Sequence, residues 1–185
     1  MVFKHLLIDS RVLFDSKDAL ERAKRNCLAK LGYSVGDNFL EQIEKLGIDE
    51  KKKFDSHFEA LYPTFFLSVM GRPYASSKEF LEFASQKIPT SAISFEYAKT
   101  YSALLKSNGL DVLLAFHFGE GEMSARKGLL EIAVEHLNVK KEDLVLISPS
   151  SCSFVRTIKF AGGDLSNLRK KVEKVLAQGR DNEVI

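Results

Sequence analysis

The chain has 185 residues, 45% of them hydrophobic and 28% charged, which is ordinary for a globular protein that buries its own core. The formal net charge of +2 gives no strong electrostatic attraction to nucleic acid. No apolar run approaches the roughly 20 residues of a membrane span, and the run after Lys4 is too short for a signal peptide. Two cysteines make no disulfide framework. We therefore expect a reduced, cytoplasmic protein that binds neither nucleic acid nor membrane.

The N-terminal segment combines a strand pattern with a carboxylate. Leu6, Leu7 and Ile8 are consecutive apolar residues, as expected of a parallel strand that is covered on both faces. Asp9 follows at the carboxyl end of this strand. Ligands of open parallel sheets bind outside the carboxyl ends of the strands, so Asp9 is a candidate nucleophile or metal ligand.

The next 70 residues favour helices, and we find no strand pattern between residues 16 and 88. Apolar residues recur there at spacings of three and four. We expect helices over 16–31 and 37–46, one from residue 49 that Pro63 should kink or break, and one from residue 76. The segment 89–91 is interpreted as a connector. The basic clusters 51–53 and 169–171 are interpreted as solvated helix faces.

From Phe95 onward, predicted helices and strands alternate. We expect helices over 95–107 and 123–137, strands over 110–116 and 144–147, and a last helix from residue 164. Residues 154–161 fit a helical face, although 156–160 also alternate well enough for a strand. Such alternation is typical of an α/β protein with a doubly wound parallel sheet and right-handed crossovers.

The segment Asp9–Ser16 resembles motif I of the haloacid dehalogenase (HAD) superfamily of phosphatases, mutases and dehalogenases. In that family an apolar strand leads into Asp-x-Asp-Gly-Thr/Val-Leu, an apolar residue and Asp-Ser. Asp9 falls on the family nucleophile, and residues 12–16 match the tail of the motif. Ser10 and Arg11 replace three family residues, so the general acid is missing. The resemblance implies a Rossmann-like core over 1–15 and 93–185, with an inserted helical cap over 16–92.

Two further family motifs are matched by position and not by residue type. Motif II ends a strand with a Ser or Thr that binds the phosphoryl group. Alignment with 109–117 puts Phe116 there, followed by His117, which is either an anion-binding or proton-transferring residue or a surface histidine. Motif III is a Lys at a helix start. Met123 takes its position, with Lys127 one turn later, either reaching the site or solvated.

Motif IV of the family supplies carboxylates that hold Mg²⁺ after a strand. The matching segment 147–153 contains no acid, and Pro149 stands at the metal-ligand position. Mg²⁺ usually needs one or two carboxylates, so we expect no metal site and no cofactor, with Mg²⁺ entering only if the chain is an enzyme. Ser148, Ser150 and Ser151 precede the possible helix 154–161, where they could hold an anion or merely cap the helix.

Arg11 has two interpretations. Its guanidinium suits a phosphate or carboxylate ligand. It could instead pair with Asp9, and we favour this pairing, which would block nucleophilic attack.

We expect a HAD-like protein with degenerate catalytic motifs that lacks standard Mg²⁺-dependent phosphatase activity. It would keep a cleft between cap and core for a small anionic molecule or a protein partner. The alternative is a divergent hydrolase, of phosphatase or dehalogenase type, with Asp9 as nucleophile and His117, Lys127 or the serine loop as helpers. The sequence leaves open whether the chain is an enzyme, and it indicates no oligomeric state.

Overall fold

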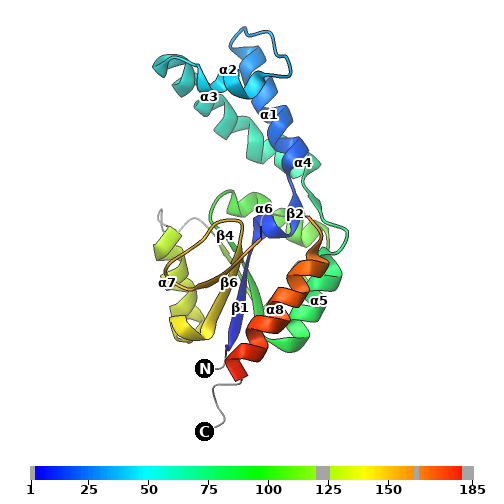
Figure 1. Ribbon diagram of the computed structural model, residues 1–185. Helices are drawn as coiled ribbons and strands as arrows, with labels where there is room; N and C mark the ends of the chain where they lie inside the picture. The colour runs from blue at the N-terminus through cyan, green and yellow to red at the C-terminus, as the bar shows by residue number, and fades with distance from the viewer. Residues whose placement is uncertain (1–2, 120–125, 161–162, 181–185) are drawn as a thin grey trace. The chain divides into compact units, whose positions relative to one another are not determined.

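The computed structural model describes residues 3–119, 126–160 and 163–180. The chain forms two compact units (Figure 1). One comprises Met1–Asp15 and Arg72–Ile185 and is called the sheet unit here. The other comprises Ser16–Gly71 and is called the helical unit.

A five-stranded parallel sheet organises the sheet unit, in the order β5-β4-β1-β6-β7. The strands are β1 (His5–Asp9), β4 (Thr90–Ser94), β5 (His117–Gly119), β6 (Leu144–Ser148) and β7 (Arg156–Lys159). Every residue of β1, β4 and β6 is buried, because both faces of the sheet are covered. This confirms the predicted α/β, doubly wound parallel fold, with β1 as its central strand.

Helices cover the two faces of this sheet. They are α5 (Ser77–Lys87), α6 (Ala98–Ser107), α7 (Arg126–Leu137) and α8 (Leu165–Arg180), with short 3-10 turns η1 (Ser10–Val12), η3 (Asp111–Leu113) and η4 (Lys141–Asp143). Leu129, Leu130 and Ala133 of α7 pack with Leu7 and Leu146 of the sheet. Helices α5 and α8 lie side by side on the opposite face (Figure 1).

The helical unit contains α1 (Lys17–Lys30), α2 (Phe39–Glu44), α3 (Ile48–Leu61), a π-helix η2 (Tyr62–Leu67) and α4 (Ser68–Met70). Its core is a cluster around Cys27, Leu28, Phe39 and Phe54. The expected break at Pro63 takes the form of the π-helix, because proline has no N–H to continue the α-helical hydrogen bonds of α3.

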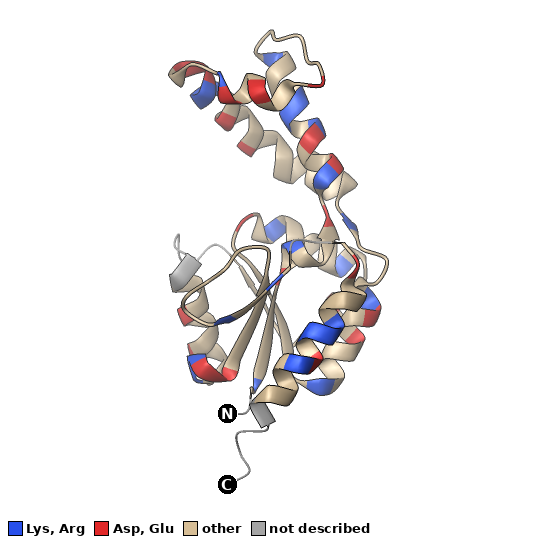
Figure 2. Ribbon diagram, in the orientation of Figure 1, with Lys and Arg blue, Asp and Glu red and all other residues tan. Residues whose placement is uncertain are grey.

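Charged side chains are spread over the helices, with acidic and basic residues interleaved (Figure 2). The cluster 169–171 is exposed, and of 51–53 only Lys51 is half-buried. Among the described residues no helix is long and apolar enough to cross a membrane.

The predicted limit of the helical region at residue 92 is wrong. Thr90 and Ser91 of the expected connector 89–91 belong to β4, which pairs with β1. A short antiparallel pairing of β2 (Phe14–Asp15) with β3 (Arg72–Pro73) also went unpredicted. The buried Ser77 Oγ then donates to the carbonyl oxygen of Leu13 at 2.7 Å, which ties α5 to the sheet unit. Residues 72–92 therefore belong with the sheet.

Two predicted elements of the second half also differ from the structure. The segment 110–116 is not a strand: it contains η3, Val112 is 80% exposed, and only Ala115 and Phe116 at its end form backbone hydrogen bonds with β4. The strand starts instead at His117. The predicted helix 154–161 is wrong, whereas the strand alternative over 156–160 is confirmed by β7.

Candidate functional site

Three neighbouring strands end in polar side chains that are buried. Asp9 ends β1, Ser94 ends β4 and Ser148 ends β6. The exposed fractions are 0% for Asp9 and Ser148 and 1% for Ser94. Since the strands are parallel, these residues share the carboxyl edge of the sheet, where α/β proteins bind ligands. This edge is the candidate site.

Arg11 holds the Asp9 carboxylate on both oxygens. Asp9 is the N-cap of η1, and its Oδ1 accepts from the backbone N–H of Arg11 at 3.1 Å and from its Nε at 3.0 Å. Oδ2 accepts from Nη2 at 2.7 Å. The hydrogen bond with Asp9, although opposed by burial, raises the pKa of Arg11 above its ordinary value. The pair is therefore a bidentate, charge-assisted one, as favoured from the sequence.

Ser148 completes the surroundings of the carboxylate. Its Oγ donates to Asp9 Oδ2 at 2.9 Å and accepts from the backbone N–H of Ser150 at 3.3 Å. Asp9 thus accepts hydrogen bonds from Arg11 N, Nε and Nη2 and from Ser148 Oγ. A carboxylate offers about four lone-pair positions. All of them are occupied, so this geometry leaves no lone pair free for nucleophilic attack.

Ser94 was missed by the sequence analysis. The strand beside β1 is β4 and not 110–116, so Ser94, and not Phe116, takes the position of the strand-ending hydroxyl. The available signal was the apolar pair at residues 92–93 followed by a serine. Its Oγ donates to Ser10 Oγ at 2.7 Å and bonds to His117 Nε2 at 2.8 Å.

His117 therefore lies beside Ser94, and no hydrogen bond joins it to Asp9 among the described residues. Burial lowers the pKa of His117, and the nearby Lys106 lowers it further. The ring is neutral near pH 7 and forms a second polar chain through Ser94 to Ser10.

The other site residues predicted from the sequence form fewer contacts with the Asp9 carboxylate or none. Lys127 lies in the first turn of α7, and its side chain is outside the described part of the structure. Ser150 contributes its backbone N–H, and Ser151 is exposed. The serine loop leads into β7 and not into a helix, so there is no helix N-terminus after it for the serines to cap or for an anion to bind.

The side chains around Asp9 do not fit Mg²⁺. This ion prefers octahedral oxygen ligands and one or two carboxylates. The single carboxylate here is engaged by a cation and a hydroxyl. Among the described residues there is no group of three or more His, Cys, Asp or Glu side chains that could hold a metal ion.

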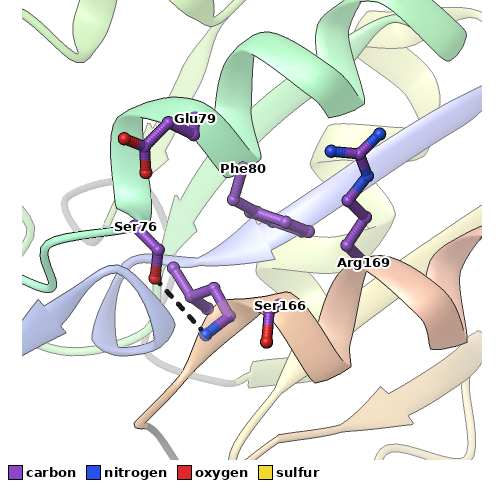
Figure 3. A pocket seen from close by; sticks show the side chains of 6 residues that line it. Ser76, Glu79, Phe80, Ser166 and Arg169 are labelled. Atoms are coloured by element: carbon purple, nitrogen blue, oxygen red, sulfur yellow. Dashed lines mark hydrogen bonds between the residues drawn. The ribbon is translucent and has the colours of Figure 1, made fainter.

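A cavity of about 160 Å³ lies between the first turns of α5 and α8, and none of Asp9, Arg11, Ser94 and Ser148 lines it (Figure 3). Ser76 and Arg169 are among its lining residues. The polar groups at the start of α8 already have hydrogen-bond partners. The N–H of Leu165 donates to Ser76 Oγ at 3.4 Å, and the N–H of Ser166 donates to Asp164 Oδ1 at 2.9 Å. The cavity is not part of the candidate site.

The described fold matches that of many solved structures, whereas the sequence matches little. No protein-family model matches the chain, and no curated protein matches it significantly. A haloacid dehalogenase-like hydrolase from Streptococcus pneumoniae is 12% identical, with a TM-score of 0.75 over 94% of this chain and 98% of that one. A predicted phosphatase from Clostridium acetobutylicum is 14% identical, with a TM-score of 0.71 over 94% of this chain and 100% of that one.

A subfamily IA HAD-superfamily hydrolase from Geobacter sulfurreducens is similar as well, at 13% identity and a TM-score of 0.70, covering 95% of this chain and 100% of that one. Likeness at this identity concerns the fold. The chain has the fold of the haloacid dehalogenase superfamily, with Asp9 at the end of its central strand.

Proposed function

We propose that this chain is a HAD-fold protein that does not carry out Mg²⁺-dependent phosphoryl transfer and that serves instead as a binding protein. One observation carries the proposal: both oxygens of Asp9 are held by the guanidinium of Arg11. An aspartyl-phosphate mechanism needs a free carboxylate oxygen, a cation facing the phosphate and an acid for the leaving group. Arg11 occupies both carboxylate oxygens of Asp9, so neither is free. Arg11 cannot act as the acid either, because it does not release its proton near neutral pH.

The proposed ligand is a small anionic molecule or an acidic group of a protein partner. The Arg11 side chain is 28% exposed, and a guanidinium has five N–H donors, more than Asp9 uses. Ser150 and Ser151 stand on the loop that follows β6, two and three residues after Ser148. Titration with inorganic phosphate, followed by amide NMR, should move the resonances of Arg11, Ser150 and Ser151 in a saturable way. Shifts without saturation would contradict this ligand class.

A hydrolase remains the competing function. The observation in its favour is the position of Asp9 and Ser94 at adjacent strand ends, in a fold shared with hydrolases and phosphatases. It requires Arg11 to leave the carboxylate when substrate binds. Lys127 and His117 would then be candidates to assist.

The two functions separate in one assay. We expect negligible hydrolysis of p-nitrophenyl phosphate and of 2-haloacids, with or without Mg²⁺, and no change of any trace rate in Asp9→Asn. Asp15→Asn, an exposed acid six residues away, is the matched control. A rate that Asp9→Asn abolishes and Asp15→Asn preserves would establish the hydrolase.

A further inference from the structure

A second cavity, of about 170 Å³, lies within the sheet unit between α6, η3 and the start of β5. Its polar lining residues are Ser102, Lys106, Asp111 and His117. A single buried water needs only about 10–15 Å³, whereas pockets for drug-sized molecules measure about 300–1,000 Å³. The cavity is therefore large enough for a small organic molecule and too small for a nucleotide-sized one.

The hydrogen bonds of His117 determine which of its ring nitrogens faces this cavity. Ser94 has one hydroxyl proton, and it is donated to Ser10 Oγ. In the arrangement in which Ser94 donates to Ser10, Ser94 accepts from His117, and the ring proton is on Nε2. In a neutral imidazole the other nitrogen, Nδ1, is then an acceptor. Burial and Lys106 lower the pKa of His117, which keeps the ring neutral near pH 7.

Nδ1 has no hydrogen-bond partner among the described residues. Among the described residues, Gln42 Oε1 is the single buried side-chain nitrogen or oxygen atom without a hydrogen-bond partner, so Nδ1 of His117 is not such an atom. His117 is one of the residues that line this cavity, so the cavity is the space that the described residues offer next to its ring. The cavity offers a ligand an uncharged acceptor beside its charged groups.

Two opposite charges line the same cavity without pairing. Lys106 stands in the last turn of α6 and Asp111 in η3. Neither forms an ion pair with a described residue. A molecule that carries a carboxylate and an ammonium group would satisfy both charges at once. A simple anion would be repelled by Asp111, and a simple cation would be repelled by Lys106.

The rest of the lining is apolar. Leu105 is buried at 1% exposure, and the other apolar lining residues are Leu114, Ala115 and Phe116. Phe116 is 47% exposed, so its ring has surface available to cover. Covering exposed apolar surface contributes about 25 cal/mol per Å². An occupant with an apolar substituent is favoured over a purely polar one such as glycine.

We propose that this cavity binds a small zwitterion of the α-amino-acid class with an apolar side chain. The carboxylate pairs with Lys106. The ammonium group donates to Asp111 and to Nδ1 of His117. The apolar side chain covers Phe116. Among its lining residues only His117 is bonded to the Asp9 edge, through Ser94, and the proposal does not rest on the proposed function.

Calorimetric titration of the full chain with L-leucine tests the site. We expect saturable binding with a Kd on the order of 1 mM or below. N-acetyl-L-leucine lacks the ammonium group and L-leucinamide lacks the carboxylate, so neither should give saturable heat. The ¹⁵N resonance of His117 Nδ1 should move on addition of L-leucine, because that atom gains a donor. No saturable heat with L-leucine, or equal binding of either analogue, would overturn the proposal.

Variants assign the charges to their residues. Lys106→Met and Asp111→Asn should each weaken L-leucine binding by about tenfold or more, which corresponds to about 1.4 kcal/mol. Lys99→Met is the matched control, since Lys99 is an exposed lysine of the same helix that does not line the cavity. Circular dichroism checks that the variants are folded. Binding as tight in Lys106→Met as in Lys99→Met would also overturn the proposal.

Discussion

Removing the Arg11 guanidinium should destabilise the fold far more than a surface ion pair would. Asp9 is fully buried, and the Arg11→Met variant leaves its carboxylate with only a backbone N–H and the Ser148 hydroxyl. Deleting one partner of a buried pair typically costs 3–5 kcal/mol. Because the Arg11 side chain is 28% exposed and partly screened, we expect the lower end, about 3 kcal/mol.

A double-mutant cycle isolates the pair. Asp9→Asn removes the buried charge, so Arg11→Met should cost less in that background, and the coupling energy should be about 2–3 kcal/mol. Urea unfolding at pH 7 measures each variant. With slopes of about 1–3 kcal/mol/M, a loss of about 3 kcal/mol lowers the urea midpoint by roughly 1 M or more.

Arg169→Met provides the control in the same unit. Its ion pair with Glu173, 3.6 Å long, is between two exposed side chains, so its loss should cost within about 1 kcal/mol. If Arg11→Met cost no more than Arg169→Met, or if the cycle gave no coupling, the Asp9–Arg11 pair would not be the buried, mutually dependent unit described above.

Three further predictions concern the sheet unit. Burial lowers the pKa of His5 from 6.5 to about 4, so between these pH values the unfolded chain binds more protons than the folded one. The free energy of unfolding should therefore fall by about 3 kcal/mol as the pH drops from about 6.5 to 4. The His5→Gln variant should lack this component of the pH dependence. Gly119→Ala should destabilise by about 1–3 kcal/mol in thermal unfolding, because its Cβ would lie 2.5 Å from that of Ala98. Ser77→Ala should cost about 1–3 kcal/mol, since it leaves the buried carbonyl of Leu13 without this donor, and Ser77→Thr, which keeps the hydroxyl, should recover part of the loss.

The sequence could predict β1 and its terminal ion pair because both depend on residues close together in the chain. Consecutive apolar residues indicate a strand covered on both faces, and Asp9 and Arg11 are two residues apart. The strand β4 could not be predicted in the same way, since it is buried although it contains Thr90, Ser91 and Ser94. The hydroxyls of Ser91 and Ser94 are satisfied by His5 and Ser10, 86 and 84 residues away. Distant hydrogen bonds leave no periodic pattern in the sequence.

The opposite error occurred at residues 110–116. An apolar run looks like a buried strand, but Leu110 is buried while Val112 is exposed, because η3 turns the chain before it reaches the sheet. The mistaken strand then took the place of β4 in the motif comparison. As a result His117 was expected next to the end of a strand beside β1, whereas it begins β5, pairs with Ala92 of β4 and reaches the edge only through its hydrogen bond with Ser94.

The short turn after β1 explains how Asp9 can keep its place at the end of the central strand while both of its carboxylate oxygens are hydrogen-bonded. Asp9 caps η1 with the same oxygen that accepts the backbone N–H of Arg11, so the turn itself directs the Arg11 side chain back onto the carboxylate. After the turn, the side chains of Val12 and Leu13 are fully buried in the core. The apolar residues that hold the sheet together are thus undisturbed by the missing residue. Fold and chemistry depend here on different side chains, which is why likeness to known hydrolases establishes the first and leaves the second to the hydrogen bonds of Asp9.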